Sequence, residues 1–110
     1  MNDKTNVLLV GVSTEIGRYV LKQLLARKDK FNITVFDVKK SRSQTLLEPL
    51  RDEITVVYGN IALPTDTVEV VKGQDFVIHC GFLSPRTACK KYPLAEEVNA
   101  LGTRFLIENL

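Results

Sequence analysis

A glycine-containing turn near the start of the chain has the residue types and spacing that bind a diphosphate. Gly11 follows a short apolar run, and Gly17 stands where a helical pattern begins. In a strand-to-helix turn of this kind the first glycine permits a tight bend, the last packs helix against strand, and a diphosphate rests on the helix N-terminus. The turn therefore predicts that a dinucleotide contacts Gly11, Ser13, Thr14, Glu15, Ile16 and Gly17.

Thr14 stands in the middle of this turn, where a glycine usually lets the backbone approach the diphosphate. Its Cβ narrows the space above the turn and costs about 1–2 kcal/mol if the backbone there is left-handed. The hydroxyls of Ser13 and Thr14 could instead donate to a phosphate. Because any strand-to-helix turn can contain glycines, this turn alone leaves dinucleotide binding and a purely structural role equally open.

Asp37 ends the second apolar run, 20 residues after Gly17. An acidic side chain at this place can accept hydrogen bonds from the adenine ribose hydroxyls. Its charge repels a 2′-phosphate and favours NAD, whereas the cations Lys39, Lys40 and Arg42 favour NADP, or else form a solvated loop. We expect NAD as the cofactor, with NADP as the alternative.

Two structural outcomes would count against this interpretation. One is a Thr14 methyl group that fills the diphosphate hollow, and the other is an Asp37 side chain turned inward to bond with its own scaffold.

Apolar runs alternate with helical patterns along the whole chain, which is typical of βαβ units and a mostly parallel sheet. Runs with the composition of buried strands stand at Asn6–Val10, Ile33–Asp37, Ile54–Tyr58 and Phe76–Cys80. Helical patterns begin at Ile16, whose apolar stripe is Ile16, Val20, Leu21 and Leu24, and recur at Ser43–Leu50, Thr65–Val71 and Pro93–Leu110. We predict an α/β fold, a Rossmann-like parallel sheet with helices on both faces.

The pattern contains four βα units, whereas a full doubly wound dinucleotide fold has about six strands. We therefore expect residues 1–110 to form the amino-terminal part of one NAD(P)-binding domain, truncated after its fourth unit. A sheet that stops there presents an open edge, so a homo-oligomer is possible.

Three further motifs stand later in the chain: Gly59-Asn60-Ile61, Asp75-Phe-Val-Ile-His-Cys-Gly81 and Asn99-Ala-Leu-Gly-Thr103. Together with the first turn, these motifs resemble the extended short-chain dehydrogenases/reductases, nearest the 3β-hydroxysteroid dehydrogenase and NAD-dependent epimerase branches. The first turn departs from the family at Thr14, and Gly59-Asn60-Ile61 replaces the family's Gly-Asp-Ile. The resemblance implies that the amide of Asn60 donates toward the adenine and that Asn99 ties its helix to a strand end. It adds Asn60, Ile61, Cys80, Gly81, Phe82 and Asn99 to the cofactor site.

The resemblance also implies hydride transfer at a hydroxyl or carbonyl carbon of a sterol-like or sugar-like substrate in the full-length parent protein. The family's tyrosine acts through a Tyr-x-x-x-Lys pair, with a Ser or Thr. Here the residues four positions after Tyr19, Tyr58 and Tyr92 are Gln23, Ala62 and Glu96. We assign no catalytic residue and expect the segment alone to be inactive. The alternatives are a non-catalytic nucleotide-sensing or protein-interaction module, or an inactive fragment.

The amino-acid composition limits the classes of partner that this chain can bind. With 110 residues, 45% hydrophobic and 25% charged, the chain has room for one compact domain. Its formal net charge of +2 is too small to indicate a nucleic-acid partner. No apolar run approaches the roughly 20 residues of a membrane span. Cys80 and Cys89, with one histidine, complete no tetrahedral metal site. We expect a reducing, cytoplasmic location.

Overall fold

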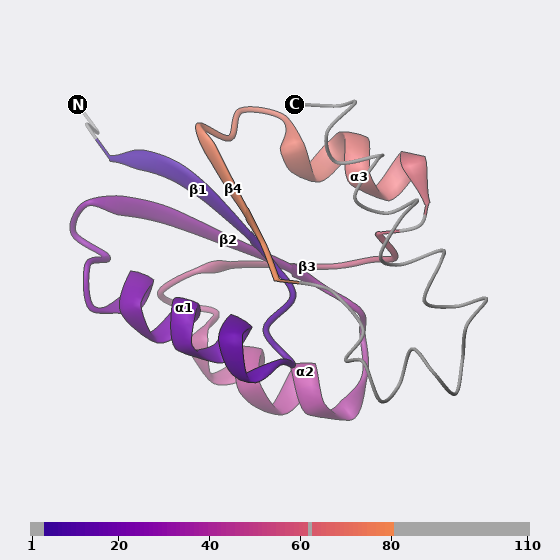
Figure 1. Ribbon diagram of the computed structural model, residues 1–110, viewed down its shortest axis with the longest axis horizontal. Helices are drawn as coiled ribbons and strands as arrows, with labels where there is room; N and C mark the ends of the chain where they lie inside the picture. The colour runs from indigo at the N-terminus through magenta and orange to yellow at the C-terminus, as the bar shows by residue number, and fades with distance from the viewer. Residues whose placement is uncertain (1–3, 62, 81–110) are drawn as a thin grey trace.

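The computed structural model describes residues 4–61 and 63–80, and these form a parallel sheet with helices on both of its faces (Figure 1). The strand order is β3-β2-β1-β4, and all three strand pairs are parallel. The strands are β1 (Thr5–Val10), β2 (Phe31–Asp37), β3 (Thr55–Tyr58) and β4 (Phe76–His79). The predicted Rossmann-like α/β fold is confirmed.

The connecting helices lie on opposite faces, as right-handed crossovers in opposite directions require. They are α1 (Glu15–Leu25), α2 (Ser41–Leu47), the short 3₁₀ helix η1 (Glu48–Leu50) and α3 (Pro64–Val71). Figure 1 shows α1 and α2 together below the sheet and α3 above it. The chain thus moves outward from β1 through β2 to β3 along one face, and returns over the other face to β4.

Strand β1 supplies both halves of the core because its successive side chains alternate between the two faces. Val7 and Leu9 pack in the cluster that includes Leu21, Leu24 and Leu47 of helices α1 and α2. The other face of β1 carries Leu8 and Val10, which pack with Val70 and Val71 of α3. Burial on both faces explains why this strand is a continuous apolar run in the sequence.

One predicted apolar stripe is wrong in its first residue. Ile16 is 70% exposed, and the buried positions of α1 are Gly17, Leu21 and Leu24. The stripe therefore begins with a glycine, one residue later than predicted, because the helix comes so close to the strand there that no side chain fits. The second predicted helix is divided as well: the α-helix ends at Leu47, before Pro49, and a 3₁₀ turn continues to Leu50.

Polar side chains fasten the sheet at its amino-terminal edge. The carboxylate of Asp75 accepts from the Asn6 backbone N–H at 2.8 Å, and the Asn6 amide donates to the Gly73 carbonyl at 2.9 Å. The Asn32 amide in turn donates to the Asn6 side-chain oxygen at 2.9 Å. Asn6 thus links the start of β1 to β2 and to the turn before β4, away from the opposite edge where the candidate site lies.

Cys89 and the helical pattern predicted from Pro93 lie outside the described residues. Within residues 4–61 and 63–80, no helix is both long and apolar enough to cross a membrane.

Candidate functional site

The carboxyl ends of all four strands meet at one edge of the sheet. The ends of β1 and β4 lie side by side, with Val10 paired to His79, while the end of β2 lies on the other side of β1. The chain leaves β1 toward β2 on one side and reaches β4 on the other, so the strand order reverses here. In open α/β sheets the ligand binds in the crevice at this switch point.

The glycines of the first turn have the structural roles that the sequence predicts. Gly11 has a φ of 87°, in the left-handed region that favours glycine. At Gly17 an added Cβ would lie 2.1 Å from the Gly11 carbonyl oxygen, so any side chain there would force helix and strand apart. Both glycines are therefore needed for the close crossing of α1 over the end of β1, and this confirms the tight turn.

Thr14 occupies the middle of the turn without backbone strain. Its φ of −88° and ψ of 161° are extended, so the condition for a left-handed penalty is not met. It is the N-cap of α1: its Oγ1 accepts from the Gly17 N–H at 2.9 Å and also donates to the Cys80 carbonyl at 3.4 Å. The hydroxyl is therefore engaged with the protein rather than directed at a phosphate.

Asp37, at the end of β2, is partly turned inward onto the same turn. Its Oδ2 accepts from the Val12 N–H at 3.0 Å and from the Ser13 hydroxyl at 3.1 Å, and its Oδ1 accepts from the Val38 N–H at 2.7 Å. This is the kind of bonding that counts against a carboxylate held only for a ligand. The side chain is nevertheless only half-buried, and a carboxylate has about four acceptor sites. Oδ1 therefore retains one for a sugar hydroxyl.

The segment after Asp37 carries the predicted cations. Lys39, Lys40 and Arg42 are all exposed. The buried Ser43 fixes this segment, because its hydroxyl accepts from the Lys40 N–H at 3.1 Å and lies 2.5 Å from the Val38 carbonyl oxygen. This role of Ser43 was not predicted from the sequence, although serine in the first turn of a helix is a recognisable signal.

The turn after β3 brings Asn60 to the same edge, and Asn60 is exposed. Its backbone N–H donates to Asp66 Oδ2 at 2.9 Å, and Gly59 leaves room for the Phe36 ring, which a Cβ would meet at 2.6 Å. Ile61 is only 5% exposed and packs in the core beneath α3. Any contact of Ile61 with a cofactor must therefore come from its main chain.

Cys80 follows β4 directly beside the glycine turn. Its backbone N–H donates to the Val10 carbonyl at 2.7 Å, and its thiol is free and half-buried. Burial raises the pKa of the Cys80 thiol and lowers the pKa of the His79 imidazole. Both groups are therefore neutral at pH 7, and neither adds charge to the crevice. The other predicted site residues, Gly81, Phe82 and Asn99, lie outside the described residues.

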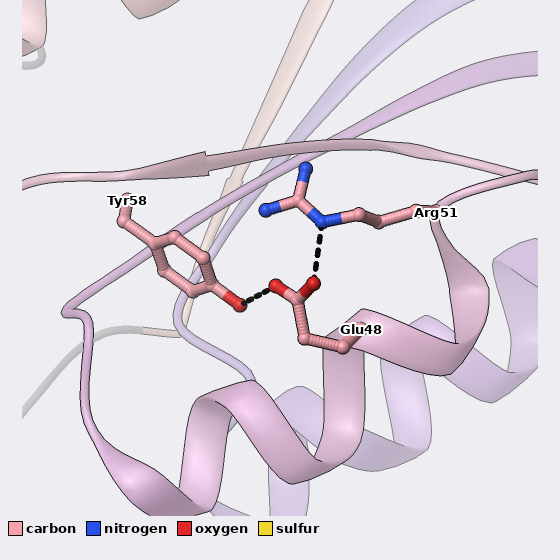
Figure 2. Close-up of polar contacts among 3 residues, drawn as sticks. All are labelled: Glu48, Arg51 and Tyr58. Atoms are coloured by element: carbon pink, nitrogen blue, oxygen red, sulfur yellow. Dashed lines mark hydrogen bonds and ion pairs between the residues drawn. The ribbon is translucent and has the colours of Figure 1, made fainter.

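Tyr58 has the opposite properties to a catalytic tyrosine, whose pKa is lowered. Figure 2 shows its hydroxyl pointing at Glu48, with Arg51 on the other oxygen of that carboxylate. The Tyr58 hydroxyl donates to Glu48 at 2.7 Å, and the Arg51 Nε donates to the same carboxylate at 2.7 Å. Burial, and then the bond to Glu48, raise the pKa of Tyr58. This polar cluster fastens η1 to β3, and no proton-transfer role follows from it.

A hollow of about 630 Å³ opens at the opposite, amino-terminal edge of β2 and β3. Charges of both signs line it, and Lys28 and Glu53 form an ion pair there at 2.6 Å. It contains none of the predicted site residues, so we do not assign the ligand to it. In the part of the chain that the structure describes, no three His, Cys, Asp or Glu side chains gather where they could hold a metal ion.

Comparison with known proteins relates this arrangement to a dehydrogenase family. Residues 8–110 match the model of the 3-beta hydroxysteroid dehydrogenase/isomerase family. A comparison with curated proteins gave no match.

Solved structures share the fold over almost the whole chain. The protein Pen from Bacillus thuringiensis has 26% sequence identity and a TM-score of 0.81, over 99% of this chain and 34% of that one. Uronate dehydrogenase from Agrobacterium tumefaciens has 19% identity and a TM-score of 0.74, over 97% and 36%. L-threonine dehydrogenase from Clostridium difficile has 16% identity and a TM-score of 0.80, over 96% and 33%. The chain thus spans about a third of the length of these proteins.

Proposed function

Because the chain belongs to the 3-beta hydroxysteroid dehydrogenase/isomerase family, we propose that it is the dinucleotide-binding part of an extended short-chain dehydrogenase/reductase. The bound cofactor is NAD, with NADP as the alternative. The proposal concerns the crevice between the ends of β1 and β4 and the neighbouring end of β2.

The observation that carries the proposal is the glycine turn at the switch point. The crossing of Gly17 over the Gly11 carbonyl leaves no room for a side chain at Gly17 and brings the N-terminus of α1 to the crevice. In the described part of the chain, the backbone N–H groups of Glu15 and Ile16 have no hydrogen-bond partner. Free N–H groups at a helix N-terminus are what a diphosphate requires.

Asp37 supports NAD as the cofactor in two ways. Its bonds to Val12 and Ser13 hold the turn in the shape that the diphosphate needs, and its Oδ1 keeps an acceptor site for a hydroxyl of the adenine ribose. A negative charge there repels a 2′-phosphate. The exposed Lys39 and Lys40 act in the other direction, which is why NADP remains the alternative. A variant of the Agrobacterium uronate dehydrogenase, similar to this chain in fold, forms a complex with NAD.

For the full-length parent we propose hydride transfer between NAD and a hydroxyl or carbonyl carbon of a sterol-like or sugar-like substrate. The nicotinamide cofactor supplies the hydride chemistry when bound. The described residues of this chain hold and orient the cofactor, and we assign none of them a role in proton transfer. The 110 residues include no tyrosine followed four positions later by lysine, so we propose that this segment alone is inactive.

A nucleotide-sensing or protein-interaction module without catalysis is a second candidate. The observation in its favour is Thr14, which already occupies the Gly17 N–H that a diphosphate could use. Such a module would bind the dinucleotide weakly and would need no reaction partner.

NADH titration of the purified chain tests cofactor binding directly. We expect a saturable change in nicotinamide fluorescence as NADH is added. An unchanged signal at millimolar NADH, with the chain shown to be folded by circular dichroism, would contradict the proposed function in both of its forms.

A pair of aspartate variants tests the site within this titration. Asp37→Ala removes a carboxylate at the candidate site, whereas Asp75→Ala removes one that also accepts from a backbone N–H but lies at the opposite edge. We expect Asp37→Ala to weaken NADH binding at least about tenfold and Asp75→Ala to leave it unchanged. Equal weakening by both variants would show that affinity follows stability, and that Asp37 is only structural.

A further inference from the structure

Thr14 makes two hydrogen bonds that connect the two sides of the crevice. Its Oγ1 accepts from the Gly17 N–H, within the turn that leaves β1, and donates to the Cys80 carbonyl directly after β4. These partners are 3 and 66 residues away along the chain. A glycine at this position could make neither bond through a side chain. The hydroxyl therefore fastens α1 to the end of β4 across the switch point.

Thr14 and Gly17 fit each other. A Cβ at Gly17 would lie 3.0 Å from the Thr14 Oγ1, closer than side chains ordinarily pack. The hydroxyl thus occupies space that is open because Gly17 has no side chain. The backbone of Thr14 is extended and unstrained, so nothing in the turn itself demands a glycine in the middle.

The same arrangement works against a diphosphate in two respects. The Gly17 N–H is already used by the cap, so one donor of the helix N-terminus is not available to a phosphate oxygen. The side chain is half-buried and belongs to the N-cap of α1, where the diphosphate would rest, so its methyl group adds bulk that a glycine at this position would not have. Added bulk at a close contact is unfavourable unless the neighbouring groups move.

We propose that Thr14 sets the affinity of this turn for a diphosphate: its hydroxyl stabilises the fold, and its bulk keeps the bound dinucleotide at low affinity. The inference rests on the proposed function, because it concerns how tightly the same crevice holds NAD. It assigns two separable effects to two parts of one side chain, which substitution can remove one at a time.

Three variants of Thr14 separate the hydroxyl from the bulk. Thr14→Ser keeps the hydroxyl and removes the methyl group, Thr14→Val keeps the bulk and removes the hydroxyl, and Thr14→Gly removes both. Each variant is titrated with NADH by fluorescence and unfolded in urea. We expect the Kd for NADH to fall about threefold in the serine variant and about tenfold in the glycine variant. It should change less in the valine variant, where the freed Gly17 N–H and the retained bulk act in opposite directions.

The urea concentration at the midpoint of unfolding is expected to depend on whether the variant keeps the Thr14 hydroxyl. The serine variant should unfold at the same urea concentration as the wild type, and the valine variant at a lower one because α1 loses its cap. If the glycine variant does not fold, the serine variant decides the outcome, since it keeps both hydrogen bonds.

The results that would overturn the inference differ from those that would overturn the proposed function. Wild-type binding with no tightening in the serine and glycine variants, or tightening in the valine variant as large as in the glycine variant, contradicts the role of Thr14 and leaves the dinucleotide site in place. Absence of NADH binding in the wild type and all variants contradicts the proposed function, and the inference with it.

Discussion

A methyl group added at Gly17 offers the sharpest test of the turn at the centre of the site. The Cβ of a Gly17→Ala variant would lie 2.1 Å from the Gly11 carbonyl oxygen, and ordinary contact begins at 3.4 Å. Because the obstacle is backbone rather than a flexible side chain, α1 and β1 must separate by about 1.3 Å. This close contact lies at the candidate site, so the substitution tests the site as well as the fold.

Two opposing effects determine how much Gly17→Ala changes the free energy of unfolding. Overpacking of a close contact typically costs about 1–3 kcal/mol, and a collision with main chain belongs at the upper end of that range. Alanine is better than glycine inside a helix by about 1 kcal/mol, which acts in the other direction. We therefore expect Gly17→Ala to lower the free energy of unfolding by about 2 kcal/mol.

Urea unfolding followed by circular dichroism measures this change, with Arg18→Ala as the control. Arg18 is the next residue of α1 and is exposed, so its replacement should alter stability by less than about 0.5 kcal/mol. The sign of the change in the free energy of unfolding decides the test. Without the collision, helix propensity alone would make Gly17→Ala more stable than the wild type. An equal or higher stability would therefore refute the described crossing.

Two further predictions concern charge. His79 is the single histidine of the chain, and burial lowers its pKa, so the unfolded chain takes up the proton first as the pH falls below about 6.5. Stability should thus fall between about pH 7.5 and about pH 5.5, and by a smaller amount in His79→Gln, as urea unfolding at the two pH values would show; equal losses would contradict the burial effect. Replacing Lys39 and Lys40 together by alanine should weaken NADPH about tenfold and leave NADH unchanged in parallel titrations. Unchanged NADPH binding would instead identify these lysines as a solvated loop.

The strands could be predicted closely from the sequence because burial on both faces restricts their composition. The run Asn6–Val10 differs by one residue from the observed Thr5–Val10, and the other three runs come equally close at their carboxyl ends. The roles of Gly11 and Gly17 were predictable for a related reason. Glycine is the residue that fits the left-handed bend at Gly11 and the close crossing at Gly17. Both requirements are therefore visible in the sequence as glycines.

The polar contacts of the site could not be predicted in the same way. Thr14 binds a carbonyl oxygen, and every residue has one, so its partner Cys80 carries no sequence signal. Asp37 was expected to face a ligand, yet its carboxylate accepts from the Val12 and Val38 backbone N–H groups, which are equally invisible in a pattern of side chains. Ile16 shows another limit: its spacing to Val20 is helical, but the sequence does not show that Gly17 lies nearest the sheet.

The central position of β1 in the sheet determines the order in which its two strand pairs can form during translation. On one side β1 pairs with β2, whose residues follow within 26 positions, so that half of the sheet can form from a short nascent chain. On its other side β1 pairs with β4, and Asn6 meets Asp75 only when 69 further residues have been synthesised. Closing so long a loop costs more entropy than closing the shorter one. Of the strand pairs that the structure describes, β1-β4 is therefore the last to become possible during translation, after the residues of β1, β2 and β3 have been synthesised.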